Sequence, residues 1–450
     1  MSDSHNSFTR RDLLTALPAA ALPVAALAVS TSASAAREKS VPSVSSAGQF
    51  PDGFLWGSAT AGHQVEGNNV NSDVWLAEHV KPTIYQEPSG DACDHYHRYR
   101  DDIALMSQLG LNCYRFSLEW SRIEPEPGEF STAELDHYRR VLATCREYGI
   151  TPFVTFNHLT TPRWFAAKGG WNDPQSPSRF AQYCERSAKH LGDLIGLAVT
   201  FNEAPLGGMF KWLGIPQEFF DTERAMFKAA AAAAGSESFS LLLSIDDERM
   251  LPNLLEAHRI GAQAMKSGKS RFPVGLTLNV ADDQPVGPDS LVERKRSQHY
   301  APWLEAAKTQ DDFIGIQNYG RLRYDKNGRV HPPKNDPDAD SFYPEGLERA
   351  IRYAAKETGK PIYISENGFE TEDDARRVEF IRRAVAGVKR ALDDGVDVRS
   401  YVHWSFFDNF EWTFGYKSKL GLVAVDRKTQ KRMVKPSAVY LGSLARRNAI

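Results

Sequence analysis

Two glutamates stand at the ends of short apolar runs and could act together as acid and base. Residues 362–364 lead through a serine to Glu366, and residues 197–201 lead to Asn202 and Glu203. Each run is typical of a buried strand, and catalytic groups of parallel barrels sit at the C-terminal ends of their strands. A lone glutamate in such a place is usually a solvated loop residue, whereas a pair of carboxylates is what hydrolysis of a glycosidic bond needs.

The two glutamates belong to a repeating pattern of short apolar runs and longer amphipathic stretches that begins at Phe50. The alternation predicts an α/β protein, a single (β/α)8 TIM barrel with elaborated βα loops. A doubly wound sheet would need a glycine-rich phosphate loop after an early strand, and the sequence contains no GxGxxG. The predicted strands are residues 54–58, 112–118, 151–156, 195–201, 274–278, 312–317, 362–365 and 398–404, and the predicted helices are residues 94–108, 132–148, 177–191, 251–266, 291–308, 346–358 and 373–393.

Two segments are longer than the barrel pattern requires. Residues 207–253 follow the Glu203 strand and include six consecutive alanines at 229–234, which favour a helix. We expect this segment to form a helical lid or wall over the mouth of the barrel. Residues 325–344 are polar and rich in proline, and we expect a long loop there. Because no repeat with a period of about 20–50 residues occurs, we expect one glycosidase domain over residues 49–450.

Composition and charge limit the classes of function. The chain has 450 residues, of which 42% are hydrophobic and 25% charged, values that are ordinary for a soluble globular protein. The formal net charge of -3 gives no basic footprint for nucleic acid. The four cysteines show no CxxC or Cys/His metal spacing. We expect Cys113 to be a buried free thiol, and a disulfide among the other three cysteines is left open.

The start of the chain has the features of a targeting segment. Arg10-Arg11 forms a twin-arginine pattern, an alanine-rich apolar run follows over residues 13–29, and Ala33-Ser34-Ala35 is an A-x-A cleavage signal. Prolines interrupt the run, which makes it a poor transmembrane span. We predict a twin-arginine signal peptide over residues 1–35, a flexible leader over residues 36–48, and a bacterial protein exported folded to the periplasm or outside the cell. An uncleaved membrane anchor is the alternative.

Taken in order, these motifs resemble those of glycoside hydrolase family 1, the β-glucosidase family. The resemblance runs from Phe50 to about Pro436. Thr200-Phe201-Asn202-Glu203 resembles the family's acid/base motif, and Ile364-Ser365-Glu366-Asn367-Gly368 resembles its nucleophile motif. The other matching stretches are residues 50–61 with Gln64, Glu66 and Gly67, then Asp94-His95-Tyr96, residues 114–117 with Trp120-Ser121-Arg122, Trp404-Ser405, residues 408–412, and Gly415-Tyr416.

The resemblance implies separate roles for the two glutamates. Glu366 is expected to be the nucleophile and Glu203 the acid/base of a retaining mechanism, in which the two carboxylates stand about 5–5.5 Å apart. Glu366 must be ionised, which a nearby Arg115 and the Tyr319 hydroxyl would favour, whereas Glu203 must hold its proton in the resting enzyme. Once the sugar is bonded to Glu366, that charge is gone and Glu203 can act as a base toward water.

The resemblance also implies which side chains bind the sugar. A misplaced hydroxyl would leave several buried polar groups unpaired, which is how such a pocket discriminates between sugars. Taken alone, each of these residues would more often have a structural role. The implied set places Gln64 and His158 near the 3- and 4-hydroxyls, Asn202 near the 2-hydroxyl, Glu411 at the 4- and 6-hydroxyls, Trp404 beneath the ring and Trp412 beside it, with Tyr319 also at the substrate.

The sequence departs from the family pattern at a few positions. Leu159 stands where a tryptophan is usual, and Gln317 stands where an asparagine is usual. An insertion over residues 212–234 replaces a stretch that the family usually has. Glu411 occupies a position where a phosphate-binding pocket would avoid negative charge, which disfavours phospho-sugars. The departures therefore bear on sugar identity and above all on the aglycone.

We expect a retaining exo-β-glycosidase, in the first place a β-glucosidase, that hydrolyses terminal β-D-glycosides through a covalent glycosyl-enzyme intermediate. The alternatives are a transglycosidase on the same scaffold, β-galactosidase, β-fucosidase or β-mannosidase specificity, and a non-catalytic carbohydrate-binding protein. The expected partner is a small-molecule β-glycoside or oligosaccharide, with no nucleic acid and no membrane beyond export. No cofactor is implied, because protonation and a carboxylate suffice. No metal is expected either, because His95-Tyr96-His97 has no evident third ligand.

Overall fold

The computed structural model describes residues 48–203, 206–243, 247–268 and 271–450. The predicted signal peptide over residues 1–35 lies outside these ranges, and so does the predicted leader over residues 36–48 except for Gly48. Both segments therefore remain predictions, and the architecture below concerns the described ranges.

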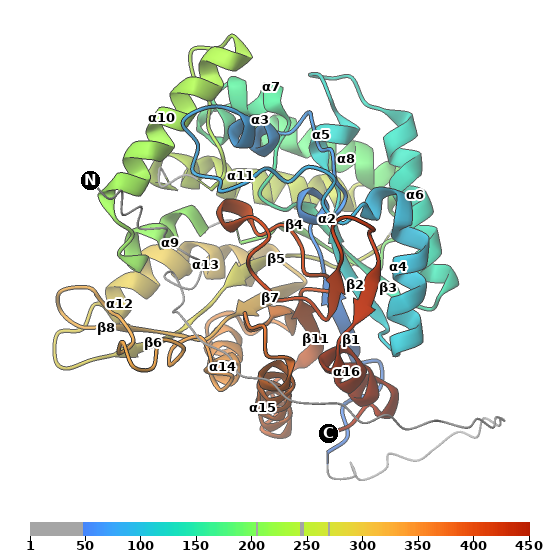
Figure 1. Cartoon of the computed structure of the whole chain (residues 1–450), viewed down its shortest axis with the longest axis vertical. Coiled ribbons are helices and arrows are strands. Elements are labelled where there is room, and N and C mark those ends of the chain that lie inside the picture. The colour runs from blue at the N-terminus through green and yellow to red at the C-terminus, as the bar shows by residue number, and fades with distance from the viewer. Residues whose placement is uncertain (1–47, 204–205, 244–246, 269–270) are drawn as a thin grey trace.

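Eight parallel strands close into a barrel at the centre of the molecule (Figure 1). The strands follow one another around the barrel in chain order, and the last strand pairs with the first. Each strand overlaps one of the eight predicted ranges, so the (β/α)8 fold class is confirmed. The barrel strands are β1 (Leu55–Ala59), β2 (Cys113–Ser117), β3 (Thr151–Asn157), β4 (Leu197–Phe201), β5 (Val274–Asn279), β7 (Phe313–Asn318), β10 (Ile362–Asn367) and β11 (Val398–Trp404).

The barrel strands are covered on both faces, which is why their sequences form continuous apolar runs rather than alternating patterns. Every residue of β2, β4, β7 and β10 is buried. The rings of Phe153, Phe313 and Tyr363, from β3, β7 and β10, pack against one another. The register between β10 and β7 shifts just before Glu366, which places Glu366 opposite Gln317.

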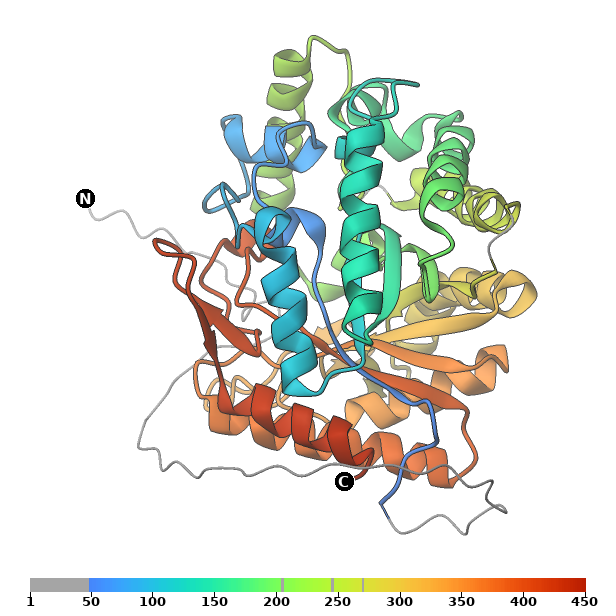
Figure 2. The same cartoon turned by 90° about the vertical axis from the view of Figure 1, so that its right-hand side faces the viewer.

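Helices follow the strands and cover the outside of the barrel (Figures 1 and 2). Six of the seven predicted helices are present as single helices. The longer helices are α4 (His95–Leu109), α6 (Thr132–Glu147), α8 (Ser176–Leu191), α11 (Asp247–Lys266), α14 (Gly346–Thr358), α15 (Asp374–Asp393) and α16 (Pro436–Arg447). Shorter helices are α2 (Gly62–Val65), α3 (Asp73–His79), α5 (Trp120–Ile123), α7 (Arg163–Ala167), η1 (Gly170–Asn172) and η3 (Trp412–Phe414).

The segment predicted to be helical over residues 291–308 is helical, with an irregular turn in its middle. The elements α12 (Val292–Lys295), a π-helical turn η2 (Arg296–Tyr300) and α13 (Ala301–Gln310) follow one another without a break. Pro302 stands in the first turn of α13. Because proline has no backbone N–H and its ring crowds the preceding turn, the regular helical hydrogen bonds cannot pass through it, and a wider turn takes their place.

The segment expected over the barrel mouth forms two helices, α9 (Leu206–Leu213) and α10 (Gln217–Ala234). The alanine run makes the last third of α10, which ends at Gly235 in the left-handed conformation with φ of 66°. Figure 1 shows α10 beside α3 and α7, and the three helices are in contact. The predicted helical wall is therefore confirmed.

The predicted polar loop over residues 325–344 contains one short strand, which pairs with one neighbour at the edge of a separate three-stranded sheet. The loop is fixed by Asp340, a buried carboxylate that accepts hydrogen bonds from Arg321 Nε and Arg323 Nε, both at 3.0 Å. The segment is thus more ordered than its composition predicts. The remaining strands are β6 (Asp282–Pro285), β8 (Arg321–Tyr324) and β9 (Arg329–Val330) of this sheet, and β12 (Val423–Val425) and β13 (Arg432–Val434), which form a hairpin.

The two ends of the described chain meet at one end of the barrel. The Phe50 backbone N–H donates to the Asn448 carbonyl at 2.9 Å, and the Trp56 indole N–H donates to the Asn448 side-chain oxygen at 2.9 Å. Figure 2 shows α16, the C-terminal helix, beside α15 at this end. All four cysteines are buried free thiols, so the prediction for Cys113 is confirmed and none of them forms a disulfide.

A buried carboxylate lies on the inner face of α10. Glu223 is 2% exposed and shares this face with Met226, which packs in an apolar cluster with Val74 and Tyr85. The Oε1 atom of Glu223 has no hydrogen-bond partner among the described residues. Burial raises the pKa of Glu223 to about 8, against a small opposing effect of Arg224. The carboxyl group is therefore protonated in the folded protein at neutral pH.

The raised pKa of Glu223 predicts that stability falls with rising pH. Below the ordinary value of 4.5 both the folded and the unfolded states hold the proton. Between 4.5 and about 8 the unfolded state releases it while the folded state keeps it, so unfolding is favoured increasingly as pH rises. Glu223→Gln removes this effect. The variant should melt at least about 2 °C higher than the wild type at pH 8, with a smaller difference at pH 4.5.

Melting curves by circular dichroism across this pH range would measure the difference. Glu218→Gln is the matched control, because Glu218 lies on the same helix and is exposed. A difference between wild type and Glu223→Gln that does not change with pH would contradict the prediction.

Candidate active site

A cavity of about 560 Å³ opens at the C-terminal ends of the barrel strands. Residues that end or follow β3, β4, β7, β10 and β11 line its inner part, and α9 lines one side. Its volume is that of pockets that bind small molecules, and catalytic groups of parallel barrels occupy this end. The cavity is therefore the candidate active site. Eight of the predicted site residues line it, namely His158, Asn202, Glu203, Tyr319, Glu366, Trp404, Glu411 and Trp412.

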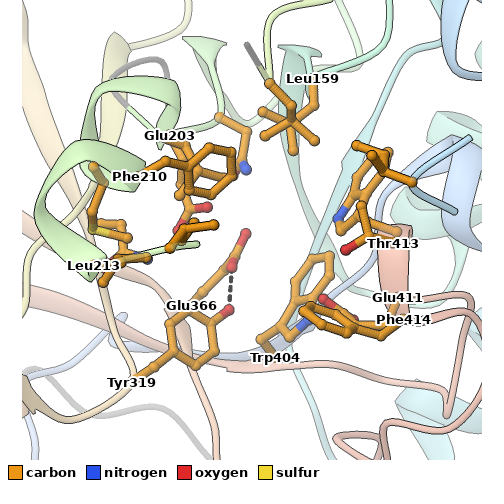
Figure 3. Close-up of a pocket in the computed structure, with 18 of the residues that line it drawn as sticks. Leu159, Glu203, Phe210, Leu213, Tyr319, Glu366, Trp404, Glu411, Thr413 and Phe414 are labelled. Atoms are coloured by element: carbon orange, nitrogen blue, oxygen red, sulfur yellow. Dashed lines mark hydrogen bonds between the residues drawn. The ribbon is translucent and has the colours of Figure 1, made fainter. Parts of the chain in front are cut away.

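Glu366 is held in the cavity by a buried ion pair. It lies near the end of β10 and is 3% exposed. Arg115 of β2 is fully buried and donates from Nη1 to Glu366 Oε1 at 2.5 Å. The Tyr319 hydroxyl donates to Glu366 Oε2, the bond that is dashed in Figure 3. Both donors favour the ionised carboxylate, since hydrogen bonds and opposite charge stabilise the charged form.

Asn202 is oriented by two donors that share its side-chain oxygen. Arg115 donates from Nη2 to Asn202 Oδ1 at 2.6 Å, and Gln317 donates from Nε2 to the same atom at 2.7 Å. Because the oxygen accepts both bonds, the amide nitrogen is turned away from Arg115 and Gln317. Asn202 also lines the cavity. Gln317, one of the departures from the family pattern, thus supports the orientation of Asn202.

Glu203 leaves the barrel wall two residues after the end of β4. Its φ of 44° lies in the left-handed region, which residues other than glycine rarely adopt. The turn is fixed by its backbone N–H, which donates to the Thr277 carbonyl of β5 at 3.1 Å. Figure 3 shows the carboxyl groups of Glu203 and Glu366 turned into the same cavity. Two strand-terminal carboxylates therefore meet in one site.

His158 stacks with two indole rings of the cavity. Its ring centroid lies 5.4 Å from that of Trp404 and 6.2 Å from that of Trp412. Burial, aided by the charge of Arg115, lowers the pKa of His158 well below its ordinary value, so the imidazole is neutral. His158 Nδ1 and Trp404 Nε1 are buried atoms with no hydrogen-bond partner among the described residues. Both residues line the cavity, so its wall carries polar atoms as well as aromatic rings.

Two predicted site residues, Gln64 and Arg115, lie behind the cavity lining rather than in it. Gln64 is fully buried and donates from Nε2 to the Phe410 carbonyl at 2.7 Å and to Glu411 Oε2 at 3.4 Å. It therefore touches the cavity through Glu411. His63 was not predicted, yet its ring stacks on Trp412 with centroids 5.8 Å apart. The sequence feature that could have identified His63 is its position next to Gln64 in the N-terminal motif.

One wall of the cavity consists of residues that sequence reasoning did not name. Leu206, Met209, Phe210 and Leu213 of α9 all line it. Their spacing of three and four residues places them on one face of the helix, so the apolar pattern of this segment would have identified them. Leu159 lines the same part of the cavity and has a φ of 73°. Leu159 and the α9 helix of the insertion thus line the same cavity.

In the sequence His95-Tyr96-His97, both ring nitrogens of His95 lie within hydrogen-bond distance of neighbouring side chains. His95 Nδ1 contacts Asp102 at 2.8 Å, and its Nε2 contacts the Tyr114 hydroxyl at 3.0 Å. Within the described ranges, no group of three or more His, Cys, Asp or Glu side chains is placed to hold a metal ion. A helix with the length and apolarity to cross a bilayer is likewise not found in those ranges.

Two buried glutamates directed into one cavity at the rim of a (β/α)8 barrel define a class, the enzymes that cleave glycosidic bonds with paired carboxylates. The sequence pattern of glycosyl hydrolase family 1 matches residues 46–307 and 297–450. The chain therefore belongs to glycosyl hydrolase family 1 and is a glycoside hydrolase.

Individual relatives extend over nearly the same length. The apo structure of a β-glucosidase named 1317 is 48% identical with a TM-score of 0.85, and the match covers 88% of this chain and 99% of that one. The β-glucosidase of Thermotoga maritima, solved with glucoimidazole, is 26% identical with a TM-score of 0.77 over 89% of this chain and 100% of that one. A 1,4-β-D-glucan glucohydrolase of Thermotoga neapolitana is 29% identical over 466 aligned positions, 89% of this chain and 99% of the relative.

Proposed function

We propose that this chain is a retaining exo-β-glycosidase with β-glucosidase activity, and that Glu366 is its nucleophile and Glu203 its acid/base. The observation that carries the proposal is the environment of Glu366, a carboxylate that Arg115 and Tyr319 hold in its ionised form inside the cavity. A second carboxyl, Glu203, is turned into the same cavity (Figure 3). A fixed anion beside a second carboxyl is what a covalent glycosyl intermediate requires.

The two carboxyl groups divide the reaction into two displacements. In the first, Glu203 gives its proton to the glycosidic oxygen while Glu366 attacks the anomeric carbon, so the bond to the leaving alcohol breaks as a bond to the carboxylate forms. In the second, Glu203 takes a proton from water, whose oxygen attacks the anomeric carbon and releases Glu366. Two inversions restore the β-configuration. Arg115 keeps Glu366 charged and oriented between turnovers.

The inner end of the cavity provides partners for the hydroxyls of one sugar unit. We assign the Asn202 amide to the 2-hydroxyl, and the neutral His158, which also lines the cavity, can accept or donate a hydrogen bond. Glu411, with Gln64 behind it, accepts from hydroxyls further around the ring. The names of the relatives, two β-glucosidases and a glucan glucohydrolase, support glucose as that sugar.

We also propose that the protein is exported through the twin-arginine route to the periplasm or beyond. The support is the pattern of Arg10-Arg11, the apolar run and the A-x-A sequence ending at Ala35. This route carries folded proteins. A fold in which all four cysteines are buried free thiols needs no oxidising compartment to form, so it is suited to folding before export.

Glu366→Gln should lower kcat for 4-nitrophenyl β-D-glucoside by about 1,000-fold or more, because the amide cannot form the glycosyl ester. Initial rates with purified protein would measure the loss. Glu372→Gln is the control, since Glu372 is exposed on the loop that follows the same strand.

Substantial residual activity in Glu366→Gln would remove the nucleophile assignment. Proton NMR of the first product of the wild-type enzyme tests retention separately. Early appearance of β-glucose is expected, and early appearance of α-glucose from a β-glucoside would refute retention.

Gln317→Leu should reduce kcat/KM for a β-glucoside by about tenfold, because loss of one donor to Asn202 frees its amide to turn. The corresponding 2-deoxy-β-glucoside should lose much less, since it lacks the hydroxyl that Asn202 would bind. The comparison requires kcat/KM for both substrates with wild type and variant. Gln317→Asn, which keeps an amide and is the usual family residue, is the conservative partner. Equal losses on both substrates would show that Gln317 has only a structural role.

Replacing both arginines of the Arg10-Arg11 pair with lysine should retain the enzyme in the cytoplasm while keeping the charge of the segment. Activity in cytoplasmic and periplasmic fractions of a bacterial host that has the twin-arginine pathway would measure this. N-terminal sequencing of the exported wild type should begin at Ala36. Export of the double-lysine variant at the wild-type level would contradict the proposed route.

A further inference from the structure

The cavity changes character between its inner and outer parts. The inner end holds the carboxylates, the amide and the imidazole described above. The outer part, contributed by α9, by the start of α10, by loops after β3 and α10 and by the end of η3, is walled by aliphatic and phenylalanine side chains. Its members include Leu159, Phe210, Leu213, Phe219, Leu241 and Phe414. Figure 3 shows Phe210, Leu213, Leu159 and Phe414 around the space in front of Glu203 and Glu366.

The lining of the cavity also includes two charged side chains, Arg321 and Lys417, and the polar side chains Gln86 and Thr413. Arg321 donates to Asp340 at 3.0 Å and lies over the ring of Tyr343, and Lys417 is exposed. A second sugar unit carries several hydroxyls, and each hydroxyl buried without a partner loses its hydrogen bonds to water. Leucine and phenylalanine walls offer no such partners. An apolar group, in contrast, gains free energy when it covers these walls and leaves water.

The wall is a built surface of the chain rather than a chance exposure. The spacing of Met209, Phe210 and Leu213 gives α9 a face directed into the cavity, while Met209 and Leu213 also pack with Val292 and Leu322 behind it. The same cavity also holds the carboxyl groups of Glu203 and Glu366. The position occupied by Leu159 would hold an indole N–H donor in the usual family pattern, and that donor is replaced by a hydrocarbon side chain.

We propose that the outer part of the cavity binds a bulky apolar aglycone, so that the preferred substrates are β-glucosides of large hydrophobic alcohols rather than cello-oligosaccharides. This inference rests on the proposed β-glucosidase function. It assigns the insertion that forms α9 and α10 to selection of the leaving group. It also separates this chain from a relative whose name specifies a glucan as substrate.

A series of n-alkyl β-D-glucosides from ethyl to octyl, together with cellobiose, tests the proposal with the purified full chain. Their leaving groups are all alkyl or sugar alcohols, so differences in kcat/KM report binding of the aglycone. Concentrations are kept below micelle formation. We expect kcat/KM to rise steadily with chain length, at least tenfold from ethyl to octyl, and the octyl glucoside to exceed cellobiose by at least tenfold. A flat series, or cellobiose as the best substrate, would overturn the proposal.

The double variant Phe210→Ser with Leu213→Ser should reduce the octyl-to-ethyl ratio of kcat/KM at least threefold. Lys211→Gln is the matched control, because Lys211 is an exposed residue of α9 that does not line the cavity. Lys211→Gln should leave the octyl-to-ethyl ratio unchanged. The same ratio in the double variant and in the wild type would contradict the role of Phe210 and Leu213 in binding the aglycone. Should the double variant fail to fold, competitive inhibition of the wild type by alkyl β-thioglucosides of the same lengths gives the same ordering, and inhibition independent of length refutes it.

Different results would refute the proposed β-glucosidase function and the proposed preference for an apolar aglycone. Absence of hydrolysis for every member of the series, 4-nitrophenyl β-D-glucoside included, would refute the proposed β-glucosidase function. Hydrolysis of all members without dependence on alkyl length would refute only the assignment of the apolar wall.

Discussion

Arg115 carries a fully buried guanidinium, and removing the partner of such a charge typically costs about 3–5 kcal/mol. Its two terminal nitrogens contact Glu366 of β10 and Asn202 at the end of β4, so one side chain of β2 links three strands of the barrel. The folded state is therefore most stable when the site has its working geometry. The same contact sets the charge of Glu366 and the direction of the Asn202 amide. The contacts of Arg115 that hold these strands together are therefore also the contacts that orient the side chains of the candidate site.

The cavity is lined partly by polar and partly by apolar side chains. Its lining combines polar side chains, among them Asn202, His158 and Glu411, with the apolar face of α9. Figure 3 shows the carboxyl groups of Glu203 and Glu366 among these side chains. In the proposed assignment, the polar part binds the sugar and the apolar part binds its leaving group.

The barrel and the paired glutamates could be predicted from the sequence because both depend on local patterns. Strands buried on two faces form continuous apolar runs, and Glu203 and Glu366 each follow such a run directly. Contacts between elements produce no comparable pattern in the sequence. Nothing in the sequence around Gln317 indicates that it donates to Asn202, since the register shift before Glu366 that aligns the strands exists only in the assembled sheet. The segment predicted to be helical over residues 291–308 is helical, and only the π-helical turn before Pro302 departs from a regular helix.

Closure of the barrel joins the parts of the chain that are made first and last. β1 pairs on one side with β2 and on the other with β11, where Leu55 lies opposite Ser400. During synthesis the second edge of β1 has no partner until almost the whole polypeptide has left the ribosome. Pairings this distant in sequence slow folding, and an unpaired edge strand is a template for aggregation. A chain that stops before β11 therefore lacks the strand that closes the barrel.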